Sequence, residues 1–553
     1  MKPSIFSLTF SIFIFITLNA NAQTPAWQWS SSFGGLLNDQ STSIANDAFG
    51  NIYVVGSFYS TTITFGSYTL VNHDNSGLTQ DVFIVKFDSI GNVVWAQGFG
   101  GSLRDEADCV VIDLLGNIVI SGKFNSPSFI FGADTLNSIG YFNLFFAKID
   151  GGGNPLWAKS IDCDSFSWVH PITTDLQNNI YVSGSFFSST LIIGANTLVN
   201  TGGADMFIAK FDSSGNVLWA KQSNGSGLEL SYSLSTNSMG QVYLGGQLQN
   251  GNSASFDTIT LASNGNISTF LVKYDSNGDV LWAKGSSGVG LAGSMYGSID
   301  ESGNPILTGY YFQGSILFDT VALPTSAGGA DVFIVKYNES GNVIWAKKAS
   351  GVNDESGYGI ATDDNNNIYV TGSFRSTKID FDQITLTTSG FDDLFIAKLD
   401  SNGNYIFAKK AGGTLQDLAY SIVYDKSGYL YLTGKYRSTS IPFNINLFNA
   451  NNTTPSDDIF IAKLYSSGTV GLPEMNQFTP GISITQNHNL SVNFTEPQIN
   501  TQVKILDITG KVIKNIAING STLNFDIHDI AKGIYIISFA SSQFIISKKF
   551  VIN

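Results

Sequence analysis

The stretch DMFIAKFDSSGNVLWAK, residues 205–221, decides the fold of this chain. Its first seven residues place Phe207, Ala209 and Phe211 on one face, and this alternation predicts a β-strand. The DSSGN segment that follows predicts a hairpin turn, because Asp forms local turns with its side chain and Gly and Asn adopt positive φ. The closing VLWAK is therefore expected to be the antiparallel partner strand.

Versions of this hairpin occur seven times along the chain. An aromatic residue marks the second strand of each copy, a lysine marks the first, and neighbouring aromatic markers are 62 to 66 residues apart. The markers are Trp29, Trp95, Trp157, Trp219, Trp282, Trp345 and Phe407, together with Lys86, Lys148, Lys210, Lys273, Lys336, Lys398 and Lys463. Such a period predicts a repeat architecture.

Each unit contains enough alternating segments for four strands. In the third unit these are residues 171–175, 180–187, 205–211 and 217–221, and no segment of the chain has a sustained helical period. Seven units of four antiparallel strands predict an all-β fold, a seven-bladed β-propeller whose first strands line the channel and whose marker-aromatic strands lie outermost. Between the second and third strands each unit has extra residues such as LIIGANTL, which we expect to form a short hairpin against the blade.

The two ends of the repeat array are incomplete and complement one another. After Lys463 the chain reads SSGTVGLPE, and the marker strand missing there is present at the N-terminus in AWQWSSSFGG. We therefore expect Trp27–Ser32 to pair with Ile459–Tyr465 and close the ring. The marker tryptophans are expected to wedge between blades. Sugar stacking is the alternative role, although identical placement in six units favours packing.

The N-terminus predicts export. Lys2 precedes an apolar run from Ile5 to Leu18 and the small-residue site Ala20-Asn21-Ala22, so residues 1–22 read as a cleaved signal peptide. No later stretch has the roughly 18 apolar residues of a transmembrane helix. A net charge of −15 with only 13% charged residues argues against nucleic acid and anionic lipid as partners. These features fit an extracellular or outer-surface protein that reaches its place through the periplasm.

Two cysteines, Cys109 and Cys163, lie in neighbouring units. An exported protein can pair them in a disulfide, and two free or buried thiols are the alternative. Neither has a further Cys or His at zinc-ligand spacing.

The repeat ends near residue 468. A proline-containing linker, residues 469–480, leads to residues 481–553, where short alternating segments and turns at 507–510 and 531–533 predict a small β-sandwich. The expected domain order is thus a signal peptide (1–22), a propeller (23–468), a linker and a C-terminal domain.

Two resemblances follow from these motifs. The combination GNxYVxGxF, xFxxxxL and DxFIAKxDxxGNxxWAK, from about Trp27 to Gly468, resembles the beta-propeller repeat (SBBP) family of bacterial exported proteins. That resemblance implies the fold and brings no catalytic residues. Residues 510–512, the Gly533-x-Tyr535 run and the closing Lys548-Lys549 resemble the type IX secretion sorting domain of Bacteroidetes, although its usual opening Pro-Asn-Pro is absent. It implies the secretion machinery as partner; an ordinary carbohydrate-binding or spacer sandwich is the alternative.

Few residues in the sequence suggest chemistry. The four histidines have no metal-binding spacing and no GxSxG occurs, so we expect neither a catalytic set nor a cofactor. Ten residues after each marker aromatic, however, five of the seven positions are acidic: Asp39, Asp105, Glu229, Glu355 and Asp417, with Ser167 and Ala292 at the other two. Loops at this position gather around one mouth of a propeller channel. The carboxylates are expected either to cap their own loops or to form a ring that draws in calcium or a polar ligand.

Three functions remain open at this point. The leading one is a non-enzymatic surface or secreted module that binds a glycan or a protein, as an adhesin or scaffold. The alternative is a secreted carbohydrate-active hydrolase or lyase that uses the carboxylates at the channel mouth. A purely structural spacer is the third.

Overall fold

The computed structural model describes most of the chain as strands and connecting loops. It describes residues 25–552 apart from 75, 163–170, 250–252, 264–266, 444, 451–454, 467–480, 485–488, 508–511, 528 and 541–544. All secondary-structure elements in this described part are β-strands. One compact unit spans Ala22–Thr469, and Val470–Asn553 belong to a second. The expected signal peptide (1–22) and linker (469–480) lie outside the described residues.

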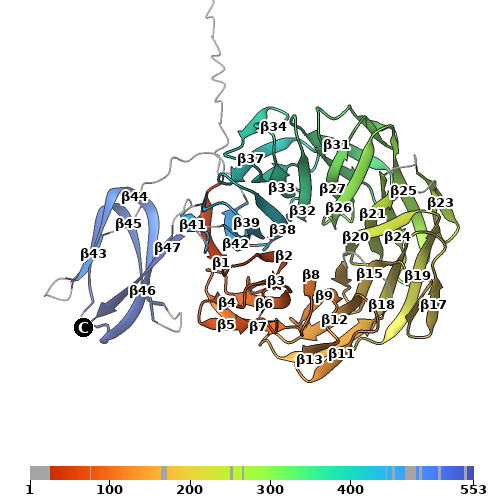
Figure 1. Cartoon of the computed structure of the whole chain (residues 1–553). Coiled ribbons are helices and arrows are strands. Elements are labelled where there is room, and N and C mark those ends of the chain that lie inside the picture. The colour runs from red at the N-terminus through yellow and green to blue at the C-terminus, as the bar shows by residue number, and fades with distance from the viewer. Residues whose placement is uncertain are drawn as a thin grey trace, which may run out of the picture. The chain divides into compact units, whose positions relative to one another are not determined.

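The first unit is a ring of seven antiparallel blades around a central channel (Figure 1). Each blade pairs its strands in chain order from the channel outward. The inner strands are β2 (Asp39–Asn46), β8 (Asp105–Ile112), β14 (Ile172–Thr174), β20 (Leu228–Thr236), β26 (Leu291–Ile299), β32 (Glu355–Thr362) and β38 (Asp417–Tyr424). The second strands are β3 (Ile52–Phe58), β9 (Ile118–Phe124), β15 (Ile180–Phe186), β21 (Val242–Gln249), β27 (Pro305–Phe312), β33 (Ile368–Phe374) and β39 (Tyr429–Tyr436).

The outer half of each blade carries the two sequence markers. The third strands are β6 (Asp81–Phe87), β12 (Asn143–Ile149), β18 (Asp205–Phe211), β24 (Ile267–Tyr274), β30 (Asp331–Tyr337), β36 (Asp393–Leu399) and β42 (Asp458–Tyr465). The outer strands are β7 (Val93–Phe99), β13 (Pro155–Ile161), β19 (Val217–Gly225), β25 (Val280–Gly288), β31 (Val343–Ala349), β37 (Tyr405–Ala411) and β1 (Trp27–Phe33). The seven-bladed propeller expected from the repeat is confirmed.

The ring closes as the two incomplete ends predict. Strand β1 pairs antiparallel with β42, with Ser30 opposite Ala462 and Phe33 opposite Ile459, so the last blade has the order β38-β39-β42-β1. The N-terminal strand therefore supplies the outer strand of the blade formed by the C-terminal end of the array. This arrangement leaves no unpaired strand where the ring begins and ends.

The extra residues of each unit form the expected short hairpins. These are β4 (Thr62–Phe65) with β5 (Tyr68–Val71), β10 (Ser128–Phe131) with β11 (Asp134–Asn137), β16 (Thr190–Ile193) with β17 (Asn196–Val199), β22 (Ser253–Phe256) with β23 (Ile259–Ala262), β28 (Ile316–Phe318) with β29 (Val321–Leu323), β34 (Lys378–Phe381) with β35 (Ile384–Thr387), and β40 (Ser440–Pro442) with β41 (Asn446–Phe448). The sequence did not predict their partner. β22 pairs with β19 and β28 pairs with β25, so each of these two hairpins extends the sheet of the preceding blade. The hairpins thus link neighbouring blades.

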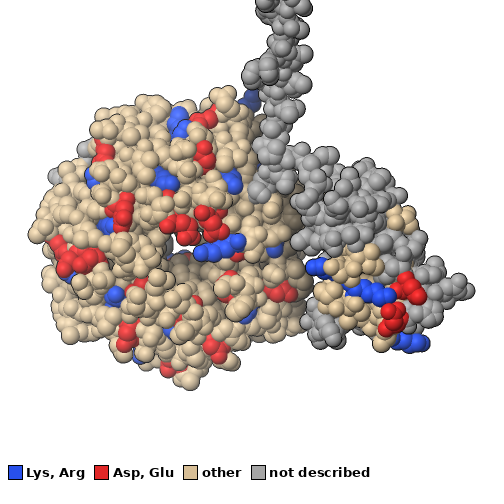
Figure 2. Space-filling model, turned by 180° about the vertical axis from the view of Figure 1, so that it is seen from behind, with Lys and Arg blue, Asp and Glu red and all other residues tan. Residues whose placement is uncertain are grey.

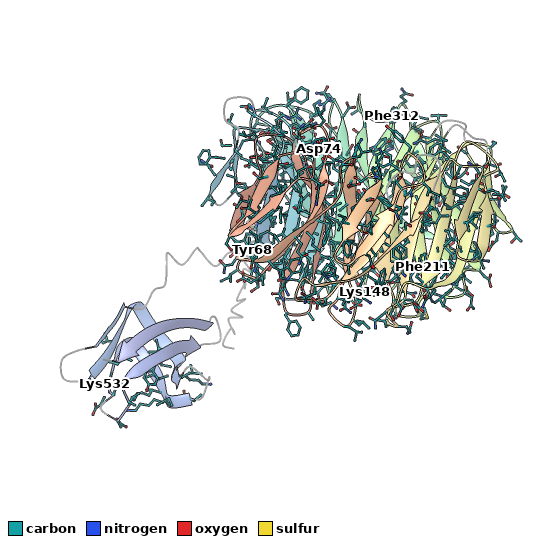
Figure 3. All side chains as sticks on the ribbon, turned by 60° about the horizontal axis from the view of Figure 1, so that its bottom comes forward. Tyr68, Asp74, Lys148, Phe211, Phe312 and Lys532 are labelled. Atoms are coloured by element: carbon teal, nitrogen blue, oxygen red, sulfur yellow. The ribbon has the colours of Figure 1, made fainter. Side chains whose placement is uncertain are left out.

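The hydrophobic core lies between the blades. The second and third strands are buried along almost their whole length, as β3, β15 and β30 show, because both faces of a blade are covered by its neighbours. Phe146 of the second blade and Phe211 of the third have ring centroids 4.5 Å apart (Figure 3 labels Phe211).

The second unit is a small β-sheet. It contains β43 (Gly481–Ile484), β44 (Asn489–Asp507), β45 (Val512–Asp526), β46 (Gly533–Ala540) and β47 (Ile545–Ile552). The strands of the expected sandwich are joined in one sheet of order β43-β44-β46-β47, in which the long β44 also pairs with β45.

Candidate functional site

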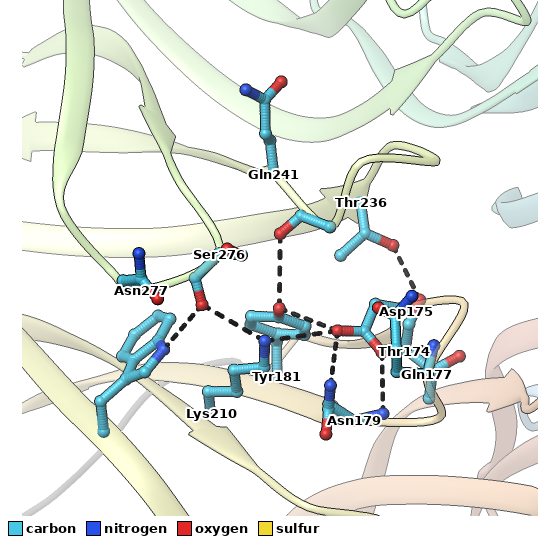
Figure 4. Close-up of polar contacts among 12 residues, drawn as sticks. Thr174, Asp175, Gln177, Asn179, Tyr181, Lys210, Thr236, Gln241, Ser276 and Asn277 are labelled. Carbon is cyan, nitrogen blue, oxygen red and sulfur yellow. Dashed lines mark hydrogen bonds and ion pairs between the residues drawn. The ribbon is translucent and has the colours of Figure 1, made fainter.

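The marker tryptophans and lysines hold neighbouring blades together. In Figure 4, Trp219 Nε1 and Lys210 Nζ donate hydrogen bonds to the same backbone carbonyl, that of Ser276 in the next blade, over 3.2 and 3.3 Å. The indole ring lies on Gly278 of the same turn, where an ideal Cβ would be 3.0 Å from the ring. Lys210 also lies 3.4 Å from Asp175 of its own blade. The packing interpretation of the marker tryptophans is confirmed.

The same contact recurs around the ring. Each marker lysine donates to a turn carbonyl of the following blade, namely those of Gly151, Ser213, Ser276, Glu339, Ser401, Ser466 and Ser89 for Lys86, Lys148, Lys210, Lys273, Lys336, Lys398 and Lys463. This contact between blades explains why the marker residues recur in every unit. A binding function must therefore involve other residues.

The five predicted carboxylates lie at the first or second residue of the inner strands, next to the loop that leads into each blade. Asp39 accepts hydrogen bonds from Gly35 N and Ser60 Oγ, both at 2.8 Å. Asp105 has the same two kinds of donor, Gly101 N at 2.8 Å and Ser126 Oγ at 2.7 Å. Asp417 is held in the same way by Gly413 N and Ser438 Oγ. These contacts support the loop-capping alternative.

Burial changes the acidity of these groups. All five side chains belong to residues at most 2% exposed. Burial raises the pKa of Asp39 and Asp417 to about 6 and that of Asp105 and Glu355 to about 7. Burial, and then the neighbouring Asp205, raises the pKa of Glu229 to about 8. Enclosed carboxyl groups cannot contact a substrate in solvent, so they give the hydrolase alternative no support.

The predicted metal site is not assembled by a shared cluster of side chains. Across the described ranges, no three His, Cys, Asp or Glu side chains gather as a metal-holding group. Of the two positions without an acid, Ala292 is buried and Ser167 lies outside the described residues. Calcium binding by Asp39, Asp105, Glu229, Glu355 and Asp417 therefore stays a prediction.

A different position of the inner strands faces the channel. In six of the seven inner strands the register with the second strand shifts by one residue at the same place, which is a β-bulge. The bulged residues are Thr42, Asp108, Tyr232, Met295, Tyr358 and Tyr420. A bulge re-aims a side chain, and the innermost strand of a blade borders the channel.

Tyrosines gather at these bulges. The rings of Tyr358 and Tyr420, from neighbouring blades, meet edge to face with centroids 5.6 Å apart. Burial raises the pKa of Tyr296, next to a bulge in the fifth blade, and the charges of Cys109 and Asp108 in the second blade raise it further. These tyrosines keep part of their surface exposed. The described channel wall is thus aromatic and accessible.

Charged side chains surround one mouth of this channel in balanced pairs. Arg375 binds Asp392 with two hydrogen bonds of 2.9 and 3.1 Å. Lys435 and Arg437 both lie 2.8 Å from Asp457. The charge of Tyr358 acts on Arg375 and that of Asp457 acts on Tyr420, so these pairs lie near the tyrosines. Figure 2 shows acidic and basic side chains side by side around the central hollow.

The tyrosines at the bulges were not among the predicted site residues, although their position in the repeat is visible in the sequence. They lie thirteen residues after a marker aromatic, and across the units this position holds Thr, Asp, His, Tyr, Met, Tyr and Tyr. The units keep their turns and markers, whereas the residue at this position differs from unit to unit. Variation at an accessible position of a rigid scaffold is typical of binding residues.

The cysteines do not add to this site. Cys109 is a free thiol in the channel wall, and its Sγ lies 3.8 Å from the carbonyl oxygen of Ile172. Cys163 lies outside the described residues. Among the described residues, no helix has the length and apolarity to cross a membrane.

Comparisons with known proteins agree with this architecture. Residues 344–373 match the model of the beta-propeller repeat family, and residues 485–553 match the secretion system C-terminal sorting domain. An uncharacterized WD repeat-containing protein of Acanthamoeba polyphaga mimivirus is 25% identical over 76% of this chain, and the chain spans 37% of its length.

Similar solved structures share little sequence with this chain. A DUF4221 family member from Bacteroides vulgatus is 10% identical, with 80% of this chain and 97% of that chain covered and a TM-score of 0.31. PorZ, a surface component of the type IX secretion system of Porphyromonas gingivalis, is 10% identical, with coverages of 94% and 99% and a TM-score of 0.16. At these values neither informs us about function. Residues 344–373 of this chain are thus a beta-propeller repeat within a seven-bladed propeller, and residues 485–553 are a secretion system C-terminal sorting domain.

Proposed function

We propose that the propeller is a secreted, non-enzymatic binding module that takes a neutral glycan at the tyrosine-lined mouth of its channel. One observation carries this proposal. The bulge repeated in six inner strands presents residues that differ from blade to blade, and Tyr232, Tyr358 and Tyr420 occupy three of the six positions.

The chemistry of the mouth favours a neutral, hydroxylated ligand. A tyrosine ring offers a flat apolar face and a hydroxyl group, and a sugar ring offers a C–H face and hydroxyl groups to match. The charges at the mouth are already paired, as Arg375 with Asp392 and Lys123 with Glu106 show. Among the described residues these pairs balance positive against negative charge, which favours a ligand without net charge. The paired charges instead provide fixed hydrogen-bonding groups around the aromatic wall.

The C-terminal sorting domain supports a role in binding outside the cell. The sorting domain indicates secretion to the cell surface or outside. We extend this to a route in which residues 1–22 direct passage to the periplasm and the C-terminal domain is handed to the type IX machinery. A surface or secreted scaffold with a polar loop face is suited to adhesion.

A glycan array probed with the full chain tests this function. The double variant Tyr358→Ala, Tyr420→Ala should lose at least about tenfold in affinity, because stacked aromatic anchors dominate such sites. Tyr141→Ala is the matched control, since Tyr141 is 65% exposed in a loop before the third strand of its blade. Unchanged binding in the double variant contradicts the channel site. Protein-only capture, or sugar release in a hydrolase panel, contradicts the glycan-binding function.

A further inference from the structure

The joints between blades contain pairs of buried acids. The third strand of a blade opens next to the loop that enters the following blade, so a residue at that opening neighbours the first residues of the next inner strand. The pairs are Asp458 with Asp39, Asp81 with Asp105, Asp205 with Glu229, Asp331 with Glu355, and Asp393 with Asp417. Every member belongs to a residue at most 2% exposed.

The two acids of a pair occur together or not at all. At the joint into the fifth blade, Ser268 and Ala292 stand where five other joints have both acids. At the joint into the third blade, the sequence has Asn143 and Ser167. If each carboxylate only capped its own loop, an acid in the third strand would not follow the presence of one in the next blade. Each pair therefore behaves as one unit.

In the part of the chain that the structure describes, every pair also holds a buried carboxyl oxygen without a hydrogen-bond partner. These atoms are Asp458 Oδ1, Asp81 Oδ1, Glu229 Oε2, Asp331 Oδ1, Glu355 Oε2 and Asp393 Oδ1. An ionised carboxylate pays a large desolvation penalty in such a place. Two ionised carboxylates side by side add mutual repulsion. Each pair thus needs a compensating positive charge, which can be a proton, a metal cation or a neighbouring basic side chain.

Packing around the unpartnered oxygens favours the proton. An ideal Cβ on Gly34 would lie 2.1 Å from Asp458 Oδ1, and one on Gly412 would lie 2.2 Å from Asp393 Oδ1. These oxygens therefore face the methylene of a glycine, which fills the space that a cation and its further ligands would need. A proton requires no such space.

The pair of Asp205 and Glu229 is the clearest case. The backbone N–H of Glu229 donates to the carbonyl oxygen of Ala204, the residue before Asp205, over 2.8 Å, and burial and then Asp205 raise the pKa of Glu229. The other groups that contact the pair are neutral: Thr201, Gln222, Ser223 and backbone amides of the loop. No charged group besides the two acids acts on this pair in the contacts that the structure describes.

We infer that each of these five joints binds one proton shared by its two acids, with Glu229 as a carboxylic acid that donates to Asp205. At acidic pH each of these joints therefore carries a single negative charge, and it gains a second one as the pH rises.

Other charged and titratable groups act on the remaining pairs. They are His73 and Asp74 on Asp81, Lys348 and Tyr311 on Asp331, Lys410 on Asp393, and Asp457 and Tyr436 near Asp458. At three joints a basic side chain, namely His73, Lys348 or Lys410, partly neutralises the negative charge of the acids. The pH response of the Asp205–Glu229 joint should therefore be the largest.

The sign of the pH response follows from the pKa of Glu229. Its folded-state value of about 8 lies above the ordinary range of a glutamate, so the folded protein holds a proton that the unfolded chain has released. The stabilisation is present at acidic pH and is lost as the pH rises toward about 8. The raised pKa values of Asp39, Asp105, Glu355, Asp417 and Asp458 act in the same direction.

Thermal unfolding of the full chain between pH 5 and pH 9 tests the inference. The wild type should lose Tm across this range. In Glu229→Gln the loss should be smaller, folding should take up about one proton fewer near neutral pH, and the Tm at pH 9 should exceed that of the wild type. Asp279→Asn is the control, because Asp279 is an exposed turn carboxylate and its loss should leave the pH profile unchanged.

A second measurement does not depend on the variant. Infrared spectra of the wild type at pH 7 should contain a protonated-carboxyl band that disappears at high pH. Absence of this band, or identical Tm profiles of Glu229→Gln and wild type, overturns the inference. A Tm at pH 9 that rises with millimolar calcium and falls with chelator also overturns it, because the pairs would then hold a cation.

Discussion

Removal of the Trp219 side chain is the most direct test of how the blades are held together. In Trp219→Ala the indole contact with Gly278 and the hydrogen bond to Ser276 are both lost. Truncation of a core aromatic residue costs about 3–5 kcal/mol. Trp219 keeps part of its surface exposed, so we expect the lower end of that range, about 3 kcal/mol. The lost hydrogen bond, worth about 1 kcal/mol, is included in this value.

Denaturant unfolding followed by fluorescence and circular dichroism measures this loss. Leu218→Ala is the matched control, because Leu218 precedes the tryptophan on the same strand and is 52% exposed; its change should stay within about 0.5 kcal/mol.

Gly278→Ala extends the test to the other blade. Gly278 has a φ of +88°, and a Cβ there would press on the indole, so this variant should also destabilise the ring. In the Trp219→Ala background the same change should cost less, since only the backbone strain remains. A loss below about 1 kcal/mol for Trp219→Ala, or full additivity of the two changes, would refute the docking argument.

Further predictions concern the closure of the ring, the sorting of the protein to the cell surface, the glycine contacts and calcium. Deletion of residues 23–35 removes β1 and should lower the Tm and cause aggregation through the exposed edge of β42; a deletion variant that melts like the parent contradicts closure. Removal of residues 481–553 should leave a folded propeller that no longer reaches the surface of its host, and unchanged surface display in cell fractionation contradicts the sorting role. Gly412→Ala should destabilise by about 1–3 kcal/mol in denaturant melts, because its Cβ would lie 2.2 Å from Asp393, and a neutral result argues against tight packing at the joint. For calcium we expect an unchanged Tm; a rise that Glu355→Gln abolishes would instead support the predicted metal site.

The fold was predictable because its determinants are local and repeated. The hairpin in residues 205–221 is predicted by its own alternation of residues on two faces and by its Asp-Ser-Ser-Gly-Asn turn. Seven copies of this pattern predict the same blade seven times. Closure was also readable, because a missing strand at one end and an extra strand at the other are visible without coordinates. The loop position of Asp39 and its equivalents followed from the same register.

What the tertiary structure alone decided are the contacts between units. The sequence placed Glu229 correctly but could not show that Asp205, from the preceding blade, lies beside it. The pairing of β22 with β19 and the bulges that present Tyr358 and Tyr420 were equally hidden. Periodicity reports which face of a strand is buried, whereas these features depend on how one blade is set against the next. That setting is fixed by packing across the ring, so the sequence by itself determined the blade, and only the assembled propeller determined its joints and its channel.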